Sequence, residues 1–210
     1  MHPPALIYGL DIETDTSVDG LDPAVSPVVT VALSTPAGDE VFAGPEADML
    51  AALDARLRVL EPGVLATWNG AAFDLPFLAD RAAACGLDLG LRLVPDPTVV
   101  LHHGPLAGHD GAYRASWYGH HHVDAYRVYR SDVGRVLRVS CSLKSIARVV
   151  GLTPVEVDRE RIHELPAAVL DAYVASDARL ARILAERRWP GAARCVDLSE
   201  APIDVKRRSG

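Results

Sequence analysis

The sequence predicts an α/β protein in which a mixed β-sheet is flanked by α-helices. Two observations lead to this class. The 210 residues include 49% apolar and 23% charged residues, the balance of a globular domain with a sizeable core. Along the chain, short apolar runs bounded by Gly and Pro come first, and stretches with helical spacing then alternate with them. That order is typical of a mixed sheet with helices on its faces.

The first half of the chain is expected to supply the first strands and two helices. Ala5 to Ile12 is an apolar run with strand character, and turn-rich sequence follows it as far as Pro27. Leucines at helical spacing predict the first helix, which ends before Pro62 and Gly63. The expected elements are, in order, strand 5–12, a hairpin of strands 28–33 and 40–42, helix 47–60, strand 64–68 and helix 75–85.

The second half is expected to be mainly loop and helix. Gly, Pro and His are frequent in residues 95–122, which predicts a long irregular loop. Helices are predicted over 142–150 and 165–188, because glycine or proline follows each of them. We therefore expect one domain over residues 1–190 and a C-terminal tail over 191–210.

Composition excludes several classes of protein. No apolar run approaches the roughly 20 residues that a transmembrane helix needs. The N-terminus from Met1 to Pro4 lacks the basic start and the apolar core of a signal peptide. Cys85, Cys141 and Cys195 are widely spaced and form neither a disulfide framework nor a zinc ribbon pattern. We therefore expect a reduced, cytoplasmic protein with no membrane partner.

Charge is distributed unevenly along the chain. The net charge is −7, but residues 1–100 hold 15 acidic against 4 basic residues. Residues 111–151 instead hold 7 basic against 2 acidic residues. Such asymmetry is typical of proteins with a nucleic-acid partner, although a solvated surface of uneven sign accounts for it equally well.

Two carboxylates lie at the end of the first predicted strand. Asp11 and Glu13 are two positions apart, so their side chains point to the same face of a strand. The apolar residues before them predict a central strand, which places both acids at the edge of a buried surface. Two like charges that close need a cation or a raised pKa. An acid pair at a strand end is also a common surface feature, so the pair alone does not establish a site.

Two further segments place polar side chains where they need partners. Asn69 is the only asparagine of the chain, which has no glutamine, and it lies where a strand meets the helix near Asp74. A turn at Asn69 and an N-cap at Asp74 are also ordinary structural roles. Tyr173 and Asp177 are four residues apart on the last predicted helix and share one face. Asp177 falls within the apolar stripe of that helix, where a carboxylate needs a metal ion or a basic partner such as arginine.

Together these residues predict a site for divalent cations. Four converging carboxylates offer only oxygen ligands, which Mg²⁺ and Mn²⁺ prefer. Two such ions about 4 Å apart clamp the attacking and departing oxygens of a phosphodiester.

Three motifs in the chain resemble those of a known enzyme superfamily. Asp11-Ile-Glu-Thr, Asn69-Gly-Ala-Ala-Phe-Asp74 and Tyr173-x-x-x-Asp177, in this order, resemble the exonuclease motifs of the DEDD superfamily of 3′–5′ exonucleases. Tyrosine four residues before the last aspartate is the mark of the tyrosine subtype. The flanking segments Phe73-Asp-Leu-Pro-Phe-Leu78 and Val123-Asp-Ala-Tyr-Arg-Val-Tyr-Arg130 are similar to the proofreading domain of family B DNA polymerases and its stand-alone relatives.

The resemblance implies a ribonuclease H-like fold and hydrolysis of single-stranded DNA or RNA from the 3′ end, with two Mg²⁺ or Mn²⁺ ions. It implies that Asp11, Glu13 and Asp177 hold the first metal ion, with Asp11 bridging to the second. Asp74 would support the second ion, and Tyr173 would orient or help to deprotonate the attacking water.

The resemblance also implies where substrate is held. Asn69 and Phe73 would line the pocket of the terminal nucleotide, with Thr14 as a further substrate contact. On the helix predicted over 142–150, Lys144 and Arg148 are four residues apart, a spacing that suits a phosphate-binding face and equally a solvated one.

The histidine-rich segment supports an alternative. Its histidines could bind zinc, but Gly and Pro surround them and no acid or cysteine lies at a convincing ligand spacing, which favours a solvated loop. Two alternatives to the exonuclease therefore remain: a catalytically silent nucleic-acid-binding module, and a histidine-rich zinc-binding protein. The histidines of this segment are His102, His103, His109, His120, His121 and His122.

The oligomeric state stays open.

Overall fold

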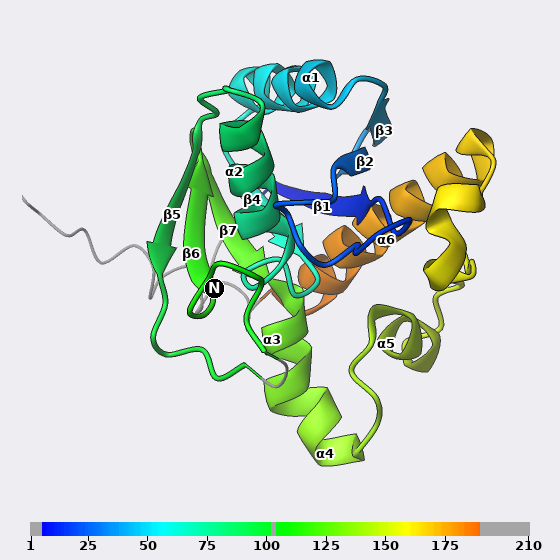
Figure 1. Ribbon diagram of the computed structural model, residues 1–210. Coiled ribbons are helices and arrows are strands. Elements are labelled where there is room, and N and C mark those ends of the chain that lie inside the picture. The colour runs from blue at the N-terminus through cyan, green and yellow to red at the C-terminus, as the bar shows by residue number, and fades with distance from the viewer. Residues whose placement is uncertain (1–5, 102–103, 190–210) are drawn as a thin grey trace, which may run out of the picture.

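Seven strands form one mixed β-sheet, and helices cover both of its faces (Figure 1). The structure is a computed structural model and describes residues 6–101 and 104–189. The strand order is β3-β2-β1-β4-β7-β6-β5. The predicted class, a mixed α/β sheet flanked by helices, is therefore confirmed. The strands are β1 Ile7–Thr14, β2 Val28–Thr35, β3 Gly38–Ala43, β4 Val64–Thr67, β5 Leu91–Pro95, β6 Tyr113–Trp117 and β7 His120–Asp124.

The helices follow the predicted order, with additions. Two short helical elements, α3 and α4, and the π-helical turn between them lie where no helix was predicted. The helix predicted over 165–188 begins at residue 167, because the preceding Pro166 takes the N-cap position. The helices are α1 Glu46–Val59, α2 Asp74–Ala84, α3 Ala125–Tyr129, α4 Arg135–Leu137, α5 Leu143–Val149 and α6 Ala167–Arg187, with a π-helical turn at Arg130–Gly134 and a 3₁₀ segment at Arg159–Glu164.

The strand β1 lies in the interior of the sheet and has a different environment on each face. It pairs antiparallel with β2 and parallel with β4. Tyr8, Leu10 and Ile12 pack into the core shared with α1 and α2. The alternate residues of β1 face α6, which packs across β1 and β2. This alternation directs the two acids of β1 toward α6.

The close approach of α6 to β1 depends on Gly9. A Cβ atom at this position would collide with the carbonyl oxygen of Ala178 on α6. Glycine within a strand often marks such an approach between two backbones. The helix therefore lies close enough to β1 for Asp177, the neighbour of Ala178, to reach the acids of the strand.

The expectation of one irregular loop over residues 95–122 is wrong. The segment contains β6 and the start of β7, and β5, which was not expected, ends at its first residue. Two buried side chains of the segment find hydrogen-bond partners on α1. The Trp117 indole donates to Asp54 Oδ1 at 2.8 Å, and His120 Nε2 lies 2.8 Å from the carbonyl oxygen of Leu57. A histidine-rich sequence therefore forms strands here, and these two side chains are buried in the structure.

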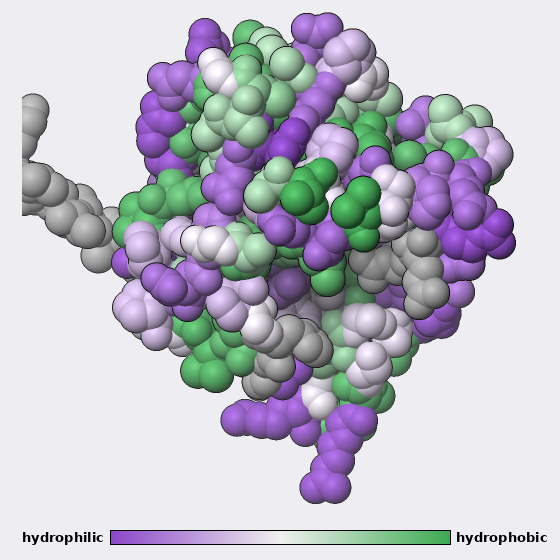
Figure 2. All heavy atoms as spheres, viewed as in Figure 1, coloured by the Kyte–Doolittle hydropathy of each residue, from purple (hydrophilic) through white to green (hydrophobic). Residues whose placement is uncertain are grey.

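The helical segment that follows β7 projects from the body of the molecule (Figure 1). It runs from α3 through the π-helical turn to α4 and ends at Arg138, whose φ of 52° is left-handed. Hydrophilic side chains extend farthest from the body at this end (Figure 2). Arg135 and Arg138 are exposed there.

Two sequence-based expectations concern the ends of the chain and the membrane. The expected tail over 191–210 lies outside the described residues, and so does residue 190. Among the residues that are described, no helix has the length and apolar character required to cross a bilayer.

Candidate active site

Three carboxylates meet where α6 passes the end of β1. Asp11 and Glu13 come from β1, and Asp177 faces them from α6. One oxygen atom from each carboxylate lies within 4.8 Å of the other two. Glu13 and Asp177 are buried, whereas Asp11 is partly exposed. The pairing with β2 shifts register between Glu13 and Thr14, so the strand is irregular beside the acids.

The donor set of this acid cluster, defined as Asp11, Glu13 and Asp177, fits a hard divalent cation. All the ligand atoms are carboxylate oxygens, and Mg²⁺ and Mn²⁺ prefer such ligands. The cluster is also the only group of three or more His, Cys, Asp or Glu side chains, among the described residues, that is arranged to hold an ion. Of the four carboxylates expected to converge, the structure groups these three, and their role as metal ligands stays a prediction.

Asp74 is buried near the acid cluster but is not one of its three members. It is the first residue of α2. The N-cap role considered for Asp74 is wrong, because Phe73 takes the N-cap position and no side chain forms a capping hydrogen bond there. Burial raises the pKa of Asp74 to about 7, and the charges of Asp124 and Glu13 add to the increase. Hydrogen bonds with the backbone of Asp74 and Ile12 act in the opposite direction. Asp74 therefore responds to the charge of the cluster.

Asp124, at the end of β7, holds the turn that carries Asn69. Its carboxylate accepts hydrogen bonds from the backbone amides of Asn69, at 2.9 Å, and Ala71, at 3.4 Å. Asn69 has a φ of 71°, a left-handed conformation that asparagine tolerates better than most residues. Burial raises the pKa of Asp124 to about 6, although the amide hydrogen bonds and Arg127 lower it. Sequence reasoning assigned no role to Asp124; the signal was its place in the segment that starts at Val123.

Tyr173 and Lys144 complete the buried side of the acid cluster. Tyr173 lies one turn before Asp177 on α6 and is almost fully buried. Lys144 extends from α5, and its ammonium group contacts Asp177 Oδ1. The same nitrogen lies 4.4 Å from the centroid of the Tyr173 ring. Asp177 therefore has the basic partner that its place in an apolar stripe requires, and the partner is a lysine rather than an arginine.

The other residues expected to contact substrate lie in different settings. The Thr14 hydroxyl donates to the carbonyl oxygen of Gly20 at 2.6 Å. Phe73 is half-buried, with its ring centroid 5.4 Å from that of Phe77, and the Asn69 residue is exposed. Arg148 forms an ion pair with Glu156. Their contacts with substrate remain predictions.

The described histidines lie in separate environments. His109 contacts Asp80 and Tyr113, and His122 hydrogen-bonds with Thr67. His120 is buried against the carbonyl oxygen of Leu57. No histidine belongs to a group of possible metal ligands within the part of the chain that the structure describes, and His102 and His103 lie outside it.

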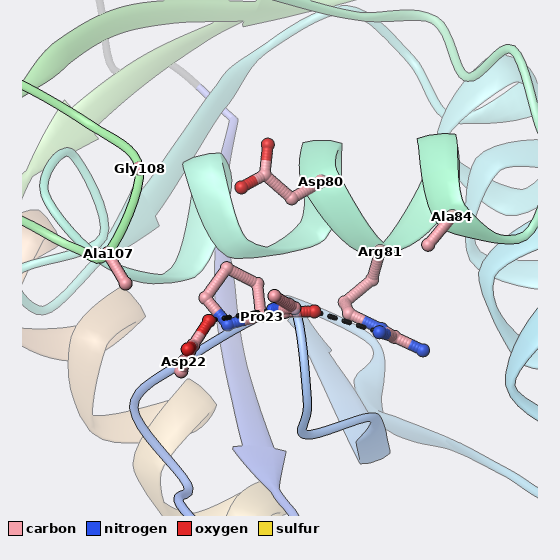
Figure 3. A pocket seen from close by; sticks show the side chains of 8 residues that line it. Asp22, Pro23, Asp80, Arg81, Ala84, Ala107 and Gly108 are labelled. Atoms are coloured by element: carbon pink, nitrogen blue, oxygen red, sulfur yellow. Dashed lines mark hydrogen bonds between the residues drawn. The ribbon is translucent and has the colours of Figure 1, made fainter.

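A cavity of about 450 Å³ is lined by residues of α2, by the loop that follows β1 and by residues 107–108. Figure 3 shows Arg81 reaching from α2 to this loop, where it donates to the carbonyl oxygen of Pro23 at 2.8 Å. None of the members of the acid cluster lines the cavity. The carboxylates, and not this cavity, therefore define the candidate active site.

Comparisons with known proteins agree with the fold. A structure of the family B DNA polymerase from the hyperthermophilic archaeon Pyrobaculum calidifontis matches 96% of this chain and 27% of its own, with a TM-score of 0.70 and 25% identity. The fold is therefore ribonuclease H-like. The catalytic subunit of DNA polymerase epsilon from Candida glabrata is 31% identical over 143 residues, 63% of this chain and 6% of the polymerase. The chain thus spans only a small part of these relatives.

The family comparison covers all seven strands and two of the three motifs. The family described as "DNA polymerase family B, exonuclease domain" matches residues 4–146. This range includes Asp11, Glu13 and Asp74 and ends before α6, which carries Tyr173 and Asp177. The match covers well over half of the chain, and so the protein belongs to the exonuclease domain family of family B DNA polymerases.

Proposed function

We propose that this protein is a metal-dependent 3′–5′ exonuclease of the tyrosine subtype. It shortens single-stranded DNA or RNA from the 3′ end. The acid cluster carries the proposal, together with Tyr173 one helical turn before Asp177. Membership of a family of polymerase exonuclease domains supports the reaction. The names of the relatives refer to DNA polymerases, which makes DNA the first substrate to test.

Two divalent ions are the proposed cofactors, and Mg²⁺ or Mn²⁺ fits the oxygen-only donor set. Asp11, Glu13 and Asp177 would hold the first ion, and Asp11 and Asp74 the second. When bound, the ions would activate water and offset the charge that develops on the phosphodiester. The four acids hold the ions, and none of them needs to form a covalent bond with substrate.

The remaining side chains position the reactants. The Tyr173 hydroxyl would orient the attacking water, because an ordinary tyrosine pKa near 10 suits hydrogen bonding better than proton removal. Asn69 and Phe73 would hold the terminal nucleotide. Water forms a bond to phosphorus, the bond from phosphorus to the 3′ oxygen breaks, and that oxygen takes a proton. The products are a nucleoside 5′-monophosphate and a chain one nucleotide shorter.

A product ladder tests the reaction and its direction together. We expect 5′-labelled single-stranded DNA, and its RNA counterpart, to shorten stepwise from the 3′ end with Mg²⁺ or Mn²⁺, and to stay intact with a chelator. If the protein binds the substrate but never cuts it, the exonuclease proposal is wrong and the catalytically silent binding module is favoured. One tightly held zinc ion in the purified protein, with no cleavage, would favour the zinc-binding alternative.

Variants of the acid cluster test which residues are needed for cleavage. We expect Asp11→Ala and Asp177→Ala to abolish cleavage, because each removes a metal ligand, while Asp48→Ala on the exposed start of α1 leaves it unchanged. Thermal unfolding should show that Asp11→Ala retains the fold, since losing one acid relieves repulsion in the metal-free cluster. Full activity of Asp11→Ala or Asp177→Ala would overturn the assignment of the site.

A cytoplasmic location remains a prediction from the cysteine pattern.

A further inference from the structure

Lys144 places a positive charge inside the acid cluster. Its ammonium group contacts Asp177 Oδ1, and the side chains of Lys144 and Asp177 are only 18% and 8% exposed. The ring of Tyr173 covers the same nitrogen, with the centroid 4.4 Å away. A lysine held this way has lost most of its water, so its charge acts strongly on its neighbours.

The packing of α5 directs Lys144 to this position. Ser142 caps the helix by accepting a hydrogen bond from the Ser145 amide. Leu143 and Ile146 are buried against Leu180 of α6. These contacts fix α5 on α6, and Lys144 therefore approaches Asp177 from a supported helix rather than from a loop.

Asp177 thus has two uses that compete for the same carboxylate. It is one of three carboxylates close enough to share a divalent cation. Without an ion, three acids this close repel one another unless another cation offsets their charge. The ammonium group of Lys144 provides that cation, but it also occupies lone pairs of Asp177 and repels a second positive charge.

We propose that Lys144 is an internal counter-cation that competes with the metal ion for Asp177. It holds the acid cluster together in the metal-free protein, lowers the affinity of the cluster for divalent ions, and leaves the Asp177 carboxylate when an ion binds. The inference rests on the proposed function in one respect, that the acid cluster binds a divalent ion.

Thermal unfolding with added Mn²⁺ tests this inference without measuring cleavage. The proteins are wild type, Lys144→Met, which keeps an apolar stem without the charge, and Arg148→Met as the control. Arg148 lies one turn further along α5 and pairs with Glu156, so its loss changes the net charge equally without removing a contact to Asp177. Each protein is first stripped with chelator, and the shift in melting temperature is followed against Mn²⁺ concentration.

We expect metal-free Lys144→Met to melt at a lower temperature than wild type, and to reach half of its Mn²⁺-induced shift at a concentration about tenfold lower. One neighbouring positive charge weakens proton binding by a carboxylate by about one pKa unit or more, and we expect an effect of this size on the divalent ion. Arg148→Met should behave as wild type in its Mn²⁺ midpoint. Lys144→Gln repeats the test with a polar side chain if the methionine variant does not fold.

Two results would overturn the inference, and they differ from a failure of the proposed function. Equal Mn²⁺ midpoints for wild type and Lys144→Met would mean that the lysine does not compete. A higher midpoint for Lys144→Met would mean that the lysine supports metal binding instead. If Mn²⁺ stabilises none of the proteins, the acid cluster does not bind metal and the proposed function fails as well.

Discussion

At the scale of single residues, Asp74 is a carboxyl whose protonation depends on its surroundings. Burial and the charges of Asp124 and Glu13 raise its pKa to about 7. An unfolded aspartate has a pKa near 3.9, so the folded state binds this proton more tightly. Asp74 therefore contributes its full stability below pH of about 4 and loses it as the pH rises toward 7.

This shift predicts a pH dependence of stability. In chelator, the wild-type free energy of unfolding should fall relative to that of Asp74→Asn as the pH rises from about 4 to about 7, because only the wild-type group must ionise in a buried place. Urea titrations of both proteins at several pH values measure the two free energies of unfolding. Their difference at each pH removes the contributions of groups that titrate alike in both proteins. Parallel curves for the two proteins would show that Asp74 titrates normally.

Asn69 shows how far one residue type can be interpreted without the fold. It is the only carboxamide of the chain, and it takes a left-handed conformation that few other side chains accept. That conformation accounts for asparagine at this position without substrate. The Asp124 carboxylate, which holds the turn, comes from a strand more than 50 residues later. The backbone turn was therefore predictable, but its support was not.

At the scale of elements, the contact between β1 and α6 determines the geometry of the acid cluster. One strand supplies two of its acids and the helix supplies the third. Only a glycine at position 9 lets the two backbones approach as they do. The spacing of the carboxylates is therefore set by helix packing as well as by the acids themselves.

Gly9→Ala is expected to separate these two elements. The added methyl group meets the backbone of Ala178, which cannot yield without moving α6, so we expect a loss of about 1–3 kcal/mol in unfolding free energy. Because Asp177 moves with α6, the Mn²⁺-induced rise in melting temperature should also decrease. Urea unfolding measures the first effect and thermal unfolding the second.

Gly111→Ala is the matched control, because nothing lies within 4 Å of a Cβ atom there and its φ is not left-handed. Its stability should change by no more than about 0.5 kcal/mol. If Gly9→Ala is as stable as this control and binds Mn²⁺ as wild type does, the close approach of β1 and α6 is not needed.

Elements with strong periodicity were predictable, and elements held by distant partners were not. The leucine spacing of α1 and the apolar run of β1 predicted both elements to within about two residues. The strands β6 and β7 contain arginine and histidine, and glycines lie beside them in the sequence. This composition suggests a loop. Both strands pair with their neighbours in the sheet, and Asp54 and Leu57 of α1 accept hydrogen bonds from buried Trp117 and His120. No local pattern carries that information.

At the scale of the whole molecule, the charge of the basic stretch over residues 111–151 is divided between internal contacts and exposed side chains. Part of its charge is used internally, since Lys144 contacts Asp177 and Arg148 pairs with Glu156. Arg135 and Arg138, at the projecting end of the helical segment, are exposed and form no ion pair with any described residue. Both are therefore available to the phosphates of a bound strand.

Charge reversal of Arg135 and Arg138 together should weaken binding of single-stranded oligonucleotides of any sequence. The slope of log affinity against log salt should become shallower by about 0.7 for each phosphate that the variant no longer neutralises. Binding measured against salt, with Ca²⁺ in place of Mg²⁺ to slow cleavage, gives both values. Reversal of the exposed Arg58 and Arg92 is the control. An equal decrease in affinity for both double variants would mean that only net charge matters.

By itself, the sequence determined which candidate side chains share one face of a strand or helix. Strand alternation placed Asp11 and Glu13 on one face, and helical spacing aligned Tyr173 with Asp177, because both depend on the regular geometry of one element. Only the tertiary structure decided which groups meet across elements. It brought Asp177 to β1, kept Asp74 outside the group of three, and placed Lys144 on Asp177. Such contacts depend on how α5 and α6 pack against each other and the sheet, and packing depends on side chains far apart in the chain.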